Sequence, residues 1–135
     1  MNAALLGSRA LGSALADTTG LRERSDEARL RYLLHAAELI AERVAICVAS
    51  ASSEPAREYA EWTAPLYRRA MVSMDDIVAM CEGLRATLPI VLTPAEMPAA
   101  ESALDAAIEV YRWHRRLAGD ARKKNPLLQA IYKGG

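Results

Sequence analysis

The sequence contains no phenylalanine, and only two tryptophans and two cysteines occur among its 135 residues. No stretch approaches the roughly 20 consecutive apolar residues that a membrane-spanning helix needs. The two cysteines are far apart in the chain and do not form a Cys-x-x-Cys pair, which is the usual start of a zinc or redox motif. From these absences we expect no membrane-spanning helix and no fold that depends on a metal ion or a disulfide for its stability.

Signatures of catalysis are also absent. The chain has no Gly-x-Ser-x-Gly turn and no glycine-rich loop for phosphate. A di-iron bundle needs Glu-x-x-His pairs, whereas this chain has His35-Ala-Ala-Glu38 in the reverse order and one other histidine, His114. We therefore expect no catalytic residue, no metal, no cofactor and no small-molecule substrate.

The formal net charge is zero, because seventeen basic residues balance seventeen acidic ones. This balance disfavours a protein that is basic over its whole surface, as histones are. Apolar residues make up 52% of the chain, which argues against intrinsic disorder. The length suits one domain spanning residues 1–135, with residues 1–20 loosely attached.

Alanine, the strongest helix former, occupies 27 of the 135 positions. β-branched residues, which strands prefer, are sparse. A core built from alanine brings helices close together but buries little apolar surface per residue, so a partner or self-association would add needed stability. The composition therefore predicts an all-α fold that associates with other subunits or with itself.

Apolar periodicity, proline and capping residues divide the chain into helices. The predicted segments are residues 1–16, 21 or 25 to 51, 53–88, 94 or 99 to 118, and 127–132. Pro65 lies inside the third segment and predicts a kink or a break near Thr63–Ala64. Thr93-Pro94-Ala95-Glu96 is a capping box before the fourth segment, and Gly119 is its expected stop. The fold class is an all-α antiparallel bundle of four to five helices, with one helix kinked near Pro65.

Three apolar stripes identify candidate core residues. Leu30, Leu34, Ala37, Ala41, Val44 and Val48 form the first; Tyr67, Met71, Met74, Val78, Cys81 and Leu88 form the second; Ala103, Ala107, Val110, His114 and Leu117 form the third. Cys47 and Cys81 lie among apolar neighbours, as buried free thiols of a cytoplasmic protein do. We therefore expect a cytoplasmic location.

Charge is unevenly distributed along the chain. Residues 112–135 carry a net charge of +6, and residues 1–111 carry −6. This C-terminal segment contains the aromatic residues Trp113 and Tyr132, and Tyr111 immediately precedes it. Cations neutralise phosphates and aromatic rings stack on bases, so this end fits a nucleic-acid surface, on a single strand or a duplex backbone. The candidate nucleic-acid-binding residues are Arg112, Arg115, Arg116, Arg122, Lys123 and Lys124.

The same concentration of positive charge is compatible with roles that involve no nucleic acid. Cations near the end of a helix offset its dipole, which accounts for two or three of them. The basic C-terminal segment could also dock on an acidic face of a second copy or of another protein, or it could be a solvated surface. A protein-only adaptor or a homo-oligomeric bundle is therefore the alternative function, with Met71, Met74 and Met80 as its adaptable surface.

Two resemblances to known proteins bear on function. Arg29-Leu-Arg-Tyr-Leu-Leu-His35 is similar to the Arg–His motif of helical HEPN ribonucleases, although it lies early in the chain and Leu30 follows the arginine. In size, helical build and local basic charge, the chain resembles the small helical subunits of CRISPR effector ribonucleoproteins. That resemblance implies a non-enzymatic subunit of a nucleoprotein assembly, which contacts RNA or DNA phosphates without reading bases.

Overall fold

In the computed structural model, residues 2–124 are described, and from residue 118 onward the description covers the backbone alone. Within this range the chain forms six α-helices and one 3-10 turn, and it contains no strand. The elements are α1 (Ala3–Asp17), α2 (Leu21–Arg24), α3 (Glu27–Ser50), α4 (Glu54–Arg69), α5 (Met74–Thr87), η1 (Leu88–Ile90) and α6 (Met97–Lys124). The predicted all-α fold is confirmed.

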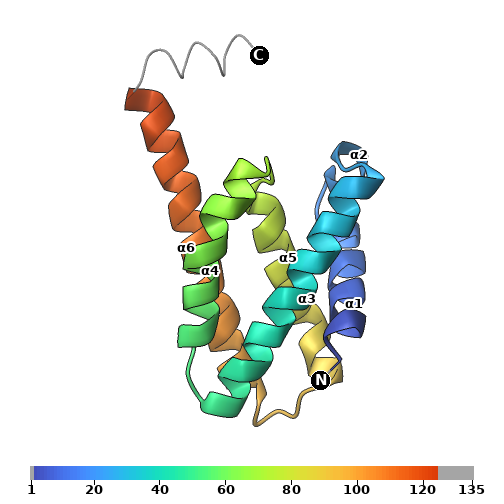
Figure 1. Ribbon diagram of the computed structural model, residues 1–135. Helices are drawn as coiled ribbons and strands as arrows, with labels where there is room; N and C mark the ends of the chain where they lie inside the picture. Colours follow the sequence, from blue (N-terminus) through green and yellow to red (C-terminus); the bar gives the residue numbers. More distant parts are fainter. Residues whose placement is uncertain (1, 125–135) are drawn as a thin grey trace.

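The five long helices form a bundle in which each one runs opposite to the one before it in the chain (Figure 1). Helix α1 packs against α3 and α5, and α6 packs against α4 and α5. Because there are two reversals between α4 and α6, these two neighbours run parallel and bring their C-terminal halves to the same end (Figure 1).

The segment 53–88, predicted as one kinked helix, is two helices. Helix α4 continues through Pro65 to Arg69, and the chain reverses over the following residues. Met71 adopts a left-handed conformation with φ of 62°, and the Val72 amide donates to the Tyr67 carbonyl at 2.9 Å. A left-handed residue just after a helix ends it, and this reversal carries none of the glycine or proline that normally marks one.

Helix α6 also differs from its expected bounds. The predicted capping box is present: the Thr93 amide donates to Glu96 Oε1 at 2.9 Å, and the Glu96 amide donates to Thr93 Oγ1 at 3.3 Å. The helix then begins at Met97 and runs through Gly119 to Lys124, so Gly119 is not a stop. One glycine inside a helix costs only about 1 kcal/mol, which a long helix tolerates. The predicted helix 127–132 lies outside the described residues.

The core is thin because small residues line it. Alanine supplies eleven of the thirty residues in the core cluster of the described chain. Backbones approach most closely where α1 meets α5: a Cβ atom at Gly83 would overlap the carbonyl oxygen of Ala10. At Gly7, a Cβ would lie 2.5 Å from Glu38 Cγ of α3. With Leu6 and Ala14 buried, these contacts dock α1 firmly on the bundle.

The predicted stripes require small corrections. On α3 the core is centred on Leu33, Ile40 and Cys47, so the buried face is rotated from the expected one. Met71 is 77% exposed, whereas Met74 and Met80 are core residues, so the three do not form a surface. The two cysteines are buried as predicted, and burial raises the pKa of Cys81 to about 12.

One ion pair connects the short helix α2 to α5. Arg24 of α2 donates to the buried carboxylate of Asp76, in the first turn of α5. Asp76 also lies near the positive end of the α5 dipole, which favours its charge. A buried carboxylate needs such a partner, because removal of one member of a buried pair leaves an uncompensated charge. The pair therefore fixes the α1–α3 connection against the rest of the bundle.

The Gly83 contact gives a stability prediction. Gly83→Ala should lower the free energy of unfolding by about 1–3 kcal/mol, because the added methyl group forces α1 away from α5. Gly12→Ala is the matched control, since nothing lies within 4 Å of its added Cβ and alanine favours the helix. It should raise the stability by up to about 1 kcal/mol. Urea unfolding measures both, and equal effects would contradict the close α1–α5 contact.

Candidate nucleic-acid interface

Five arginines lie in the last turn of α4 and in the second half of α6. We call this surface the basic end; it consists of Arg68 and Arg69 in the last turn of α4 and Arg112, Arg115 and Arg116 of α6. The two helices are packed side by side, and α6 continues past the end of α4 (Figure 1). The fold thus adds two cations from the middle of the chain to those predicted from its C-terminal part.

The predicted site residues differ in their surroundings. Arg115 pairs with Asp75 of α5, with 3.2 Å between Nε and Oδ1. Arg112 and Arg116 are exposed and make no ion pair with any side chain that the structure describes. Arg122, Lys123 and Lys124 lie in the part of α6 of which only the backbone is described. Arg112 and Arg116 are therefore the cations best placed to meet an anionic partner.

The length of α6 decides how much of this charge the helix dipole accounts for. The dipole acts mainly within the last turn of a helix. Because the described part of α6 extends to Lys124, Arg112 and Arg116 lie at least two turns before its end, at about 3.6 residues per turn. The dipole therefore does not account for Arg112 and Arg116.

The three aromatic residues of the basic region do not share one role. Tyr111 is fully buried, and its hydroxyl lies 2.9 Å from Thr63 Oγ1 of α4, so it cannot stack on a base as expected. Tyr132 lies outside the described residues. Trp113 is half exposed and lines a groove of about 270 Å³ between α4 and α6. The other lining residues are Arg57, Glu61, Glu109, Val110 and Arg116.

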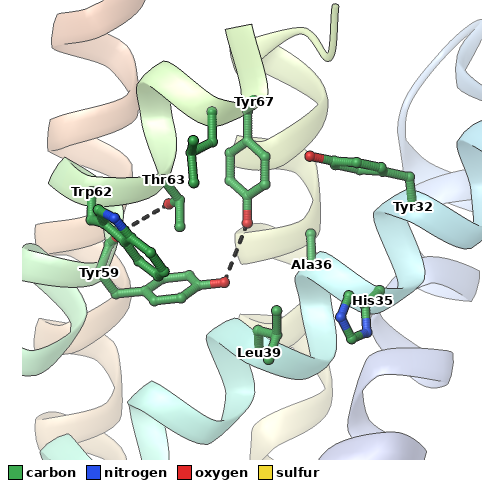
Figure 2. Close-up of a pocket in the computed structure, with 9 residues that line it drawn as sticks. Tyr32, His35, Ala36, Leu39, Tyr59, Trp62, Thr63 and Tyr67 are labelled. Carbon is green, nitrogen blue, oxygen red and sulfur yellow. Dashed lines mark hydrogen bonds between the residues drawn. The ribbon is translucent and has the colours of Figure 1, made fainter. Parts of the chain in front are cut away.

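A second groove, between α3 and α4, is almost wholly apolar (Figure 2). Its volume is about 260 Å³, and its walls are the side chains of Tyr32, His35, Ala36, Leu39, Tyr59, Trp62, Thr63, Leu66 and Tyr67. Trp62 is 66% exposed, and Leu66 and Tyr32 are also accessible. The sequence patterns did not identify this surface. Its residues come from two helices, and as a group they belong to none of the three predicted apolar stripes.

Hydroxyl groups lie beneath the second groove. Tyr59 and Tyr67 have their oxygens 3.4 Å apart, and Thr63 Oγ1 donates to the Tyr59 carbonyl at 2.7 Å (Figure 2). Burial raises the pKa of Tyr67 and Tyr111 well above the ordinary tyrosine value. Both phenols therefore stay protonated within the core, where they form hydrogen bonds with neighbouring hydroxyl groups.

Arg29 and His35 are both on α3, but six helical residues place them about 120° apart around its axis. One chain therefore does not bring these two side chains together as a ribonuclease pair. Among residues 2–117, no three His, Cys, Asp or Glu side chains are grouped to hold a metal ion.

Comparisons with known proteins found no match to this chain among protein families, curated proteins or solved structures. Within the described part of the chain, every helix is too short or too polar to cross a membrane.

His114, next to Trp113, gives a prediction of pH dependence. Burial and the nearby Arg68 guanidinium lower the pKa of His114 below its ordinary value of 6.5, although Glu61 opposes this. Its Nδ1 is buried without a hydrogen-bond partner among the described residues. The unfolded state then binds more protons near pH 6, so stability is present above the ordinary histidine pKa and is lost as the pH falls below it.

Replacement of His114 should reduce the dependence of the unfolding free energy on pH. Between pH 7.5 and 5.5, we expect the wild type to lose more unfolding free energy than His114→Gln, which has no titrating group at this position. Urea unfolding at both pH values measures the difference. Identical losses in the two proteins would show that His114 titrates alike in the folded and unfolded states.

Proposed function

We propose that this protein is a non-enzymatic helical subunit of a nucleoprotein assembly, and that it binds nucleic-acid phosphates through the basic end. The observation that carries the proposal is that Arg68 and Arg69 of α4, and the unpaired Arg112 and Arg116 of α6, lie in the C-terminal halves of two helices that pack in parallel. The resemblance to small helical subunits of CRISPR effector ribonucleoproteins implies the same role.

Phosphate neutralisation would supply the binding energy. Each arginine that replaces a condensed counterion releases it into solution, so affinity falls as salt rises. Exposed arginines on rigid helices also keep a fixed spacing, which sets the position of a strand without specifying its sequence. The remaining surface carries a negative charge overall, because the chain as a whole is neutral. A nucleic acid would therefore be directed to one end of the bundle.

Neutralisation of the two unpaired arginines tests the proposal. Arg112→Gln with Arg116→Gln should weaken binding of a labelled oligonucleotide about tenfold at low salt, and it should reduce the slope of log K against log salt by about 1–2. Fluorescence anisotropy over a series of salt concentrations measures both quantities.

The matched control is Arg9→Gln with Arg31→Gln, which removes the same charge from exposed positions on α1 and α3. It should leave affinity and salt slope close to those of the wild type. Absence of binding by the wild type at low salt, or equal losses in the two double variants, would contradict the proposal.

Self-association is the second candidate function, and the apolar groove between α3 and α4 favours it. Exposed Trp62 and Leu66 beside an apolar groove are unusual on a monomer, because large accessible apolar patches commonly mark interaction sites. A homo-oligomer would bury this surface and add stability to an alanine-rich bundle.

The molecular mass in solution tests whether the protein self-associates. If the groove is a self-association surface, light scattering should give a multiple of the 14.7 kDa chain mass for the wild type. Trp62→Glu should shift the protein toward the monomer, since a charge placed in an apolar contact is costly. A wild type that stays monomeric at high concentration would eliminate this function.

A further inference from the structure

The two tryptophans of the chain lie on opposite flanks of α4. Trp62 belongs to the apolar groove with α3, and Trp113 belongs to the polar groove with α6. Trp113 has cations next to it: Arg116 lines the same groove, and Arg112 precedes it in the chain. An accessible indole ring next to exposed arginines is the combination that proteins use to hold single-stranded nucleic acid.

Charges inside the polar groove indicate which part of a strand it accommodates. Two arginines, Arg57 and Arg116, face two carboxylates, those of Glu61 and Glu109. Arg57 also lies 3.5 Å from Glu54, which takes up part of its charge. The lining therefore has no surplus positive charge to attract a phosphate. A neutral base does not need a surplus of positive charge in order to bind. Its N–H groups can donate hydrogen bonds to the carboxylates.

The volume of the polar groove independently limits which ligand can enter it. The groove encloses about 270 Å³, near the lower limit for pockets that hold small organic molecules. A single planar heterocycle matches this space, and a base within a duplex would first have to be unstacked and unpaired, at a cost in free energy, before it could enter. The His114 ring stands edge-on to the indole, with 86° between the planes and 5.4 Å between centroids, which helps to fix the indole orientation.

We propose that Trp113 is a stacking platform for one unpaired base, and that the strand held at the basic end is therefore single-stranded RNA or DNA. Phosphates flanking the base would contact Arg112, outside the groove, and the exposed side chain of Arg116, which lines it. This inference rests on the proposed nucleic-acid function and adds to it the strand type and the position of one base.

The experiment compares three variants of the full chain: Trp113→Leu, Trp113→Phe and, as the matched control, Trp62→Leu. Each is titrated with a 12-nucleotide single strand, as RNA and as DNA, and with the corresponding duplexes. Circular dichroism confirms folding of each variant. Trp113→Leu should bind the single strand about tenfold more weakly, because a stacked base is lost. Trp113→Phe should recover part of that loss, and Trp62→Leu should bind like the wild type.

The tryptophans provide a second readout. In Trp62→Leu, the remaining fluorescence comes from Trp113 and should be quenched on addition of the single strand. In Trp113→Leu, the fluorescence of Trp62 should stay unchanged. The RNA and DNA arms show whether the sugar matters to a base held in this way.

The results separate this inference from the proposed function. If duplex and single strand bind equally and Trp113→Leu has no effect, the base site is wrong while phosphate binding stands. If Trp62→Leu is the weaker binder, the base contact lies in the other groove, which also overturns the inference. If no strand binds the wild type at low salt, both proposals fail.

Discussion

Close approach of helices through small side chains is the constraint on which the rest of this structure depends. Gly83 against the Ala10 carbonyl, and Gly7 against Glu38, bring α1 into contact with two helices at once. Alanine along α3, α4 and α6 extends the same close packing through the bundle. Helices at such short separation leave little space for large side chains. The core accommodates Tyr111, whose hydroxyl has a partner in Thr63, while both tryptophans remain outside.

The reversal after α4 has the largest consequence for function. Because Met71 ends α4 in a left-handed conformation, α5 returns along the bundle and α6 is placed parallel to α4. A single kinked helix would have directed Arg68 and Arg69 away from the basic part of α6. Instead the fold makes one basic end from two segments more than forty residues apart in the sequence. It also creates the polar groove of Trp113 along the contact between these helices.

Helix α4 separates two surfaces of different chemistry. On its α3 side the groove is apolar and aromatic, and on its α6 side the groove carries balanced charges next to exposed arginines. The first surface is suited to another apolar surface, and the second to a charged polymer. Because the two surfaces are on opposite flanks of one helix, a subunit could associate with itself and hold a strand at the same time without competition between the two contacts.

The sequence by itself determined the all-α class, the burial of both cysteines, the capping box before α6 and the concentration of positive charge in the last part of the chain. These features depend on local chemistry: alanine content, apolar spacing, side chains that cap a helix, and charge counts. Only the tertiary structure decided where the long middle segment divides, which methionines are core, which aromatic residues are accessible, and which arginines lack a partner. Each of these depends on contacts between helices distant in sequence. A left-handed methionine, a buried Tyr111 and an exposed Trp113 follow from how closely the backbones pack, and no pattern within one helix records that distance.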